Sequence, residues 1–219
     1  MQQSLSQFFA KVYGWTFLGL VVSGVAALWI NSMPGVQLKL YTNGWIMFGL
    51  IIFELFLVVW LVARLDKMSA GMANGFYFFF AALNGVTLSV IFVAYDIGTI
   101  AIAFFTAAVM FIVMSIIGMF TKVDLSKMGG ILLMGLIGVI LASIINMFMQ
   151  SSIFDFVISI ITVIIFTLLT AYDTQKLKKY HAQAGDNKEA NSKAALMGAL
   201  ALYLDFINMF LALLRIFGR

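Results

Sequence analysis

Three acidic residues stand within or at the end of long apolar stretches of this sequence: Glu54, Asp173 and Asp205. A carboxyl group is costly in an apolar surrounding, above all in lipid. Such a residue therefore faces the protein interior or a water path, and it commonly marks a route for ions or protons. The three acids are the residues from which we expect chemistry, and that chemistry is the binding of protons or cations.

Asp205 lies in the stretch of residues 199–210, which is less uniformly apolar than the others. On a helical wheel its side chain shares one face with small or polar residues, namely Ala194, Gly198, Ala201, Asn208 and Ala212. Small residues let helices approach closely in membranes. We therefore predict that other helices surround this segment and that Asp205 points into the bundle. The alternative is a structural carboxylate, hydrogen-bonded to Tyr, Ser or Thr neighbours.

Asp173 lies at the end of the preceding apolar stretch, where the alternative is an ordinary solvated residue at the membrane surface. If the last helix began in the membrane plane at Ala194, Asp205 would lie roughly 16 Å deep and Asp173 near the surface. The two can meet only if both helices extend beyond the headgroups or the bundle opens a cytoplasmic vestibule. Two neighbouring carboxylates cannot both ionise cheaply, so the pair would titrate jointly and could act as a pH sensor and gate.

Glu54 lies about ten residues from either end of its apolar stretch, with only apolar residues beside it in the chain. It must face the interior, be protonated or line a water path, unless its role is purely structural. Arg64 follows near the end of the same stretch, where its charge can reach the interface. Arg215 is similarly placed near the end of the last stretch.

Membrane-spanning helices are the elements that must position these residues. Of 219 residues, 63% are hydrophobic and 10% are charged, whereas a soluble domain is nearer half apolar and a quarter charged. The apolar stretches reach the roughly 20 residues that cross a bilayer as a helix, and they lack the alternation of barrel strands. We predict an all-α polytopic membrane protein with one membrane domain, residues 1–219, and seven spans: 10–30, 44–63, 75–95, 98–119, 130–149, 153–173 and 194–217.

The connections predict the orientation. The longest of them, residues 175–193, is expected to be a mobile cytoplasmic loop in which the lone histidine, His181, is solvated. With a cytoplasmic N-terminus, that side receives ten Lys and Arg and the other side receives three, Lys39, Arg215 and Arg219. If the last segment re-entered and returned, the count would become 12 to 1, so both paths stay open. Lysines in such loops suit an anionic lipid leaflet, and no nucleic acid partner is expected.

Two stretches resemble a known family. Residues 170–178 (TAYDTQKLK) and 201–218 (ALYLDFINMFLALLRIFG) are similar to the two signature stretches of the Bax-inhibitor-one family, and the hydrophobic layout is similar throughout, most of all to bacterial members. The resemblance implies a seven-helix bundle with the last helix central, and a pH-sensitive calcium leak across the bacterial plasma membrane.

The resemblance also implies roles for individual residues. Asp173 and Asp205 would be the paired aspartates of the pH sensor and gate, and Glu54 would be the acid of the second helix, on the ion route. All three would bind calcium transiently, as the transported ion. Arg64 would be the basic latch residue, and Arg215 the arginine of the last-helix motif.

Other functions stay open at this stage. A regulatory protein that binds a membrane protease or another membrane partner could carry both aspartates. An intramembrane aspartyl protease would use two carboxylates to activate water, but Leu202-Tyr-Leu204 precedes Asp205 where Gly-x-Gly is expected. Proton-coupled transport of a small solute is a further alternative. We predict no enzyme activity and no cofactor; calcium ions, protons and the lipid bilayer are the expected partners.

Overall fold

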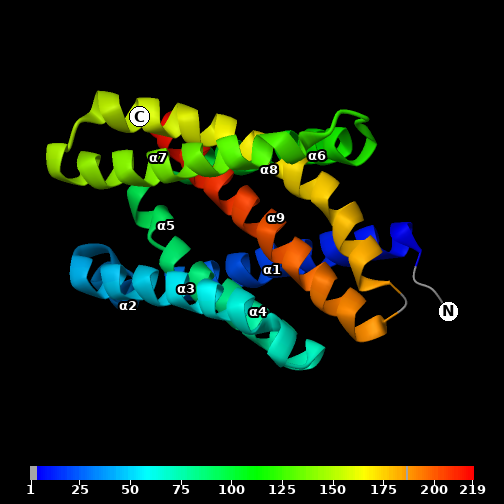
Figure 1. Ribbon diagram of the computed structural model, residues 1–219. Helices are drawn as coiled ribbons and strands as arrows, with labels where there is room; N and C mark the ends of the chain where they lie inside the picture. Colours follow the sequence, from blue (N-terminus) through cyan, green and yellow to red (C-terminus); the bar gives the residue numbers. More distant parts are fainter. Residues whose placement is uncertain (1–3, 186) are drawn as a thin grey trace. The chain divides into compact units, whose positions relative to one another are not determined.

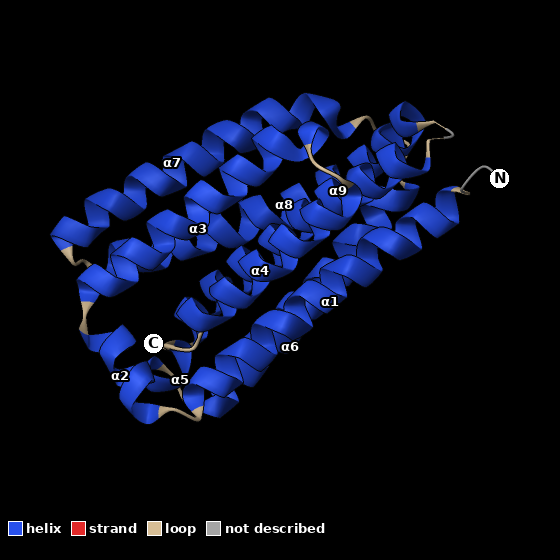
Figure 2. Ribbon diagram, turned by 90° about the horizontal axis from the view of Figure 1, so that it is seen from below, coloured by secondary structure: helices blue, strands red, loops and turns tan. Residues whose placement is uncertain are grey.

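The computed structural model describes residues 4–185 and 187–219, and every regular element within them is a helix (Figure 2). Polar residues define several helix starts: Ser4, Asn43 and Ser69 each accept a hydrogen bond from the amide three residues on. Such a cap satisfies one of the free N–H groups of the first turn. The elements in chain order are α1 (Leu5–Asn31), α2 (Pro34–Thr42), α3 (Gly44–Arg64), η1 (Leu65–Lys67), α4 (Ala70–Leu88), α5 (Ile91–Ala94), α6 (Ile97–Phe120), η2 (Leu125–Lys127), α7 (Met128–Met149), α8 (Ser152–Ala184) and α9 (Lys188–Phe217).

Seven helical segments are long and apolar enough to cross a membrane, which confirms the all-α class and the predicted number of spans. The last of them differs from the rest. In the most apolar stretch of α9, 72% of the residues are buried, against 6% to 39% in the other six. A helix that is buried nearly all round packs against protein rather than lipid. α9 is also unbroken from Lys188 to Phe217, so it does not turn back along its length.

The long loop predicted at residues 175–193 is wrong over most of its length. α8 continues to Ala184 and α9 begins at Lys188, so only a short connection separates them. The physical reason is tertiary contact: Thr174 and Leu177 are completely buried, and the ammonium of Lys178 donates to the carbonyl of Met119 in α6. Within the predicted loop, Asp186 lies outside the described residues.

Two features of the chain were not predicted. Helix α2 lies between the predicted first and second spans, and Pro34 occupies its first helical position. The third span is interrupted, because α4 ends at Leu88 before α5 begins. The side-chain amide of Gln37 donates to the carbonyl of Ser89 at 2.9 Å, so α2 satisfies a backbone group that the interruption frees.

The helices form two compact units. Unit 1 comprises the described residues of Met1–Asp96 and Tyr180–Tyr203, and unit 2 comprises Ile97–Lys179 and Leu204–Arg219, so α8 and α9 contribute to both. The single membrane domain stays a prediction. In unit 1, α1 and α4 lie side by side (Figure 1). The approach depends on Gly85, because a Cβ there would overlap the backbone of Ser23.

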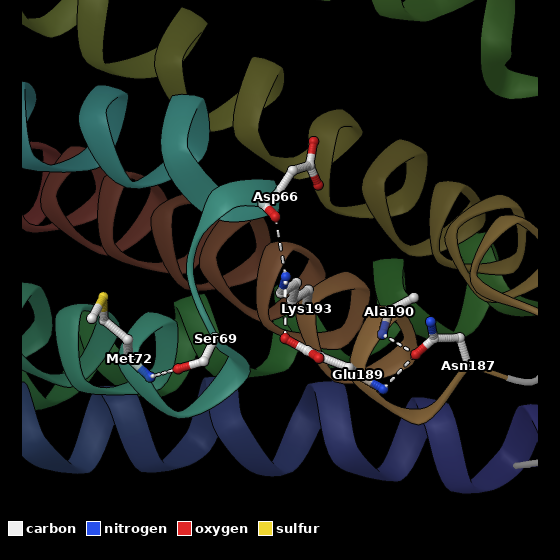
Figure 3. Close-up of polar contacts among 7 residues, drawn as sticks. All are labelled: Asp66, Ser69, Met72, Asn187, Glu189, Ala190 and Lys193. Atoms are coloured by element: carbon white, nitrogen blue, oxygen red, sulfur yellow. Dashed lines mark hydrogen bonds and ion pairs between the residues drawn. The ribbon is translucent and has the colours of Figure 1, made fainter.

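Polar contacts fix the start of α9 within unit 1 (Figure 3). The side-chain oxygen of Asn187 accepts from the amides of Glu189 and Ala190 at 2.9 and 3.1 Å. One turn on, the ammonium of Lys193 lies 3.3 Å from a carboxylate oxygen of Glu189 and 3.3 Å from the carbonyl of Asp66 in η1. The cytoplasmic start predicted for the last helix is therefore capped and tied to the end of α3.

Candidate functional site

Asp173 and Asp205 both belong to unit 2, on α8 and α9. The two helices contact each other in antiparallel order: the hydroxyl of Thr167 lies 4.0 Å from the sulfur of Met209, and His181 meets Asn191 close to the connection. Asp173 and Asp205 fall between these contacts on their respective helices. Both helices also extend past the two acids, as the predicted meeting requires.

The carboxyl groups of this pair have contrasting surroundings. Asp205 is 3% exposed, and its Oδ2 has no hydrogen-bond partner among the described residues. The charge of Asp173 acts on Asp205, and the charge of Lys176 acts on Asp173. A buried acceptor without a donor is costly, and a second carboxylate beside it adds repulsion. The two acids that the sequence pairs are therefore close enough to act on each other electrostatically, and one oxygen of Asp205 has no donor among the described residues.

Close helix contacts flank Asp173. A Cβ added at Gly118 of α6 would overlap the backbone of Ala171, and one added at Gly129 of α7 would overlap the ring of Tyr172. On the other side along α8, the side chain of Gln175 accepts from the amide of Leu125 and donates to the carbonyl of Val123, both at 2.8 Å. Helix α8 is thus held against α6, α7 and the connection between them at the level of the pair.

An acid outside the spans lies in that same connection. The carboxylate of Asp124 accepts hydrogen bonds from the hydroxyl and the amide of Ser126, at 2.5 and 3.0 Å. These bonds favour the ionised form and hold the pKa of Asp124 below its ordinary value. The ammonium of Lys179 donates to the Ser126 hydroxyl at 2.5 Å, which links this turn to α8.

Glu54 is buried in unit 1 and is fully hydrogen-bonded. Its Oε2 accepts from the amide nitrogen of Asn84, and its Oε1 accepts from the hydroxyl of Thr87, both at 2.9 Å. The interior position that the sequence predicts is therefore observed. Its place on an ion route stays a prediction.

The two arginines lie near helix ends, as expected from the sequence. Arg64 ends α3 with an exposed side chain, and its guanidinium has no hydrogen-bond or ion-pair partner within residues 4–185 and 187–219. Arg215 lies 3.8 Å from the carboxylate of Asp155 in α8. The roles of latch and charge partner stay predictions for both, and no group of three or more His, Cys, Asp or Glu gathers in the part of the chain that the structure describes.

Several polar residues of the interior were missed from the sequence. Asn84, Thr87, Tyr203 and Ser23 connect to Glu54 through side-chain hydrogen bonds. The available signal was the presence of amide and hydroxyl side chains in the middle of apolar stretches. The solvated environment predicted for His181 is wrong, because its ring packs 5.1 Å from that of Phe8 and its Nδ1 lies 3.1 Å from the side-chain oxygen of Asn191.

Seven long apolar helices, two of which carry a buried acid, Glu54 and Asp205, define a polytopic membrane protein. The chain belongs to the Bax inhibitor-1 family, whose family model, described as inhibitor of apoptosis-promoting Bax1, matches residues 5–219. The signature stretches around Asp173 and Asp205 therefore lie within a match that covers nearly the whole chain.

Bacterial relatives cover the same length. Inner membrane protein YbhL of Escherichia coli K12 is 44% identical over 216 residues, which are 98% of this chain and 92% of that protein. A membrane protein of Streptococcus pyogenes serotype M3 is 41% identical over 217 residues, 98% of this chain and 93% of its own. A protein of Rickettsia prowazekii is 37% identical over 219 residues, with 99% and 91% covered.

Proposed function

We propose that this protein is a pH-sensitive calcium leak channel of the bacterial plasma membrane, gated by Asp173 and Asp205. The observation that carries the proposal is the unsatisfied, buried Oδ2 of Asp205 beside a second carboxyl group. Buried polar groups are nearly always hydrogen-bonded, so an orphan of this kind points to a missing proton or cation. Family membership supports the same proposal, because the resemblance implies a calcium leak.

A proton shared by the pair gives the closed state. When one carboxyl group is protonated, it donates to the neighbouring carboxylate, and the Asp205 oxygen gains a partner. That hydrogen bond joins α8 to α9. At higher pH both groups ionise and repel each other. A calcium ion then compensates the two charges with oxygen ligands of the kind it prefers, and it passes as cargo rather than staying as a cofactor.

The proposal includes an orientation. The excess of lysine and arginine, ten against three, places the N-terminus and the α8–α9 connection in the cytoplasm. Seven single crossings then place the C-terminus outside. The chain has no cysteine, so a single cysteine introduced at Ser6 or at Gly218 is the only thiol. An impermeant maleimide added to intact cells should label the second and spare the first.

Calcium flux in proteoliposomes tests the function. The purified protein should release calcium at a rate that depends on pH, and protein-free liposomes should not. Asp173→Asn and Asp205→Asn should each abolish the pH dependence, because an amide cannot take up or lose the shared proton. An unchanged pH profile in either variant would overturn the gate, and no flux at any pH would overturn the channel.

A second candidate is a regulatory protein that binds a membrane partner. The family description, inhibitor of apoptosis-promoting Bax1, names the inhibition of a protein rather than transport and favours this candidate. The same assay separates the two functions. Co-purification of a membrane partner from the native membrane, together with absence of flux in liposomes, would support regulation.

A further inference from the structure

A chain of polar side chains, all buried except the half-buried Asn84, joins four helices of unit 1. The hydroxyl of Ser23 in α1 lies 2.7 Å from that of Tyr203 in α9, and the Tyr203 hydroxyl donates to the side-chain oxygen of Asn84 in α4 at 2.8 Å. The Asn84 amide nitrogen and the Thr87 hydroxyl then donate to the two oxygens of Glu54 in α3. Ser23 is 2% exposed, Tyr203 is fully buried, and Thr87 and Glu54 are each 8% exposed.

Tyr203 fixes the orientation of the Asn84 amide. A phenol hydroxyl has one proton, and here it is given to the Asn84 oxygen. The Asn84 nitrogen must then face Glu54, where it donates to Oε2 at 2.9 Å. Oε2 therefore accepts from a group that cannot itself accept a hydrogen bond. A proton bound to Glu54 finds an acceptor in this network on Oε1, where it faces the Thr87 oxygen.

Thr87 is placed to respond to that proton. Its single hydroxyl proton has two acceptors at the same distance, 2.9 Å: Oε1 of Glu54 and the backbone carbonyl of Asn84. When Glu54 is ionised, Thr87 donates to Oε1. When Oε1 carries a proton, it donates to the Thr87 oxygen, and Thr87 turns its own proton to the carbonyl. Each donor keeps an acceptor in both states, and only one hydroxyl has to rotate.

We propose that Glu54, with Thr87, Asn84 and Tyr203, forms a proton-binding site that is chemically separate from the aspartate pair. The site presents hydrogen-bond donors to the carboxylate, whereas a calcium ion needs six to eight oxygens whose lone pairs face it. This assigns Glu54 a role other than the calcium ligation that the family resemblance implies. It does not depend on the flux proposed for the pair.

The neighbouring charges are few. α9 contributes Tyr203, a titratable phenol on which the charge of Glu54 acts. α4 contributes the neutral side chains of Asn84 and Thr87. The ionisable side chains of the other elements packed against α3 are exposed: Lys39 and Tyr41 of α2, and Asp66 and Lys67 of η1. The proton would therefore be bound by Glu54 itself.

The composition allows a direct test. The chain has two glutamates, Glu54 and the exposed Glu189, so Glu189→Gln leaves Glu54 as the sole glutamate. In this background, ¹³C-labelled glutamate marks one carboxyl group for infrared spectroscopy. We expect acidification to produce an isotope-shifted carboxylic C=O band. Calcium added at constant pH should leave the labelled carboxylate bands unchanged. A calcium-dependent shift, or no such C=O band at any pH at which the protein stays folded, would overturn the proposal.

Two substitutions of the same residue test the geometry. Thr87→Val keeps the shape but removes the hydroxyl, so the C=O band of protonated Glu54 should move to higher wavenumber as its hydrogen bond is lost. Thr87→Ser keeps the hydroxyl and should restore the wild-type position. Equal bands in both variants would contradict the site. If the valine variant does not fold, the labelled titration in the Glu189→Gln background still decides the proposal, and neither measurement requires calcium flux.

Discussion

Two buried acid sites of this protein differ in how their oxygens are satisfied. In unit 1, both oxygens of Glu54 accept hydrogen bonds from neutral donors at 2.9 Å. In unit 2, Oδ2 of Asp205 is buried and has no donor within residues 4–185 and 187–219, and another acid, Asp173, acts on Asp205. In the sequence the three residues look alike, since each is an acid in an apolar stretch. In the structure they differ in whether donors satisfy both oxygens of the carboxylate.

This difference indicates which of the two acid sites is expected to respond strongly to pH. A satisfied network specifies one arrangement, because every donor already has its acceptor. An unsatisfied oxygen beside a second carboxyl group has two ways to lower its free energy, by binding a proton or by binding a cation. Under the proposed gate, the aspartate pair would favour two arrangements of its helices, whereas Glu54 would change its protonation with the rotation of one hydroxyl.

The largest expected effect is loss of coupling within the aspartate pair. If the two carboxyl groups share one proton, as proposed, the double variant Asp173→Asn/Asp205→Asn should show the same pH-independent flux as each single variant. Non-additivity of this kind is the signature of residues that act as one unit. The measurement is calcium flux in proteoliposomes for the four proteins of the cycle.

A matched acid serves as the control for this cycle. Asp66 is exposed in η1, and Asp66→Asn should leave the pH profile unchanged. If the effects of Asp173→Asn and Asp205→Asn add instead, the two residues titrate separately and the comparison between a paired site and a single site fails.

The next effect concerns the helix contact beside the pair. Gly118→Ala introduces a Cβ that overlaps the Ala171 backbone, and overpacking of this kind typically costs about 1–3 kcal/mol. Gly130→Ala is the control, because a Cβ there meets no neighbouring atom. We expect a lower thermal unfolding midpoint and an altered pH profile for the first variant only. Equal midpoints would show that α6 and α8 separate without cost.

The number of spanning helices, and which residues face the protein interior, could be predicted from the sequence because lipid imposes a length and a polarity on each span. The extent of α8 and α9 could not. The last turns of α8 are held by contacts with residues far away in the chain, such as those of Gln175 with Leu125 and of Lys179 with Ser126, whereas the cap of α9 at Asn187 is local. The low hydropathy of the lysine-rich residues 175–184 predicts a loop, although tertiary contacts stabilise a helix there.

The acids of the candidate sites were predictable, but their partners were not. An ionisable residue in an apolar stretch can be recognised from the sequence alone. Asn84 and Tyr203 acquire their importance only when α4 and α9 bring them together, because hydroxyl and amide groups are common in membrane helices and most bond locally. The orphan oxygen of Asp205 is likewise a property of packing, and no sequence pattern reports it.

A smaller effect distinguishes the network from an isolated hydrogen bond. Tyr203→Phe removes the donor to Asn84 and the contact with Ser23, and should destabilise the protein by about 1–2 kcal/mol. Tyr77→Phe removes one buried hydroxyl that donates to the Trp15 carbonyl at 3.0 Å, at an expected cost of about 0.6 kcal/mol. Unfolding in mixed detergent micelles measures both. A cost for Tyr77→Phe equal to or above that for Tyr203→Phe would argue against a connected network.

The smallest effect is expected at Asp124, an exposed acid outside the spans. The bonds from Ser126 lower its folded-state pKa, so its contribution to stability is fully present above the unfolded value, about 3.9, and is lost as the pH falls through the lower folded value. Between pH 6 and 8, Asp124→Asn should therefore leave a constant difference in unfolding midpoint and an unchanged flux profile. The difference should shrink only in strong acid. A difference that varied between pH 6 and 8 would place part of the pH response outside the aspartate pair, in the turn that Lys179 joins to α8.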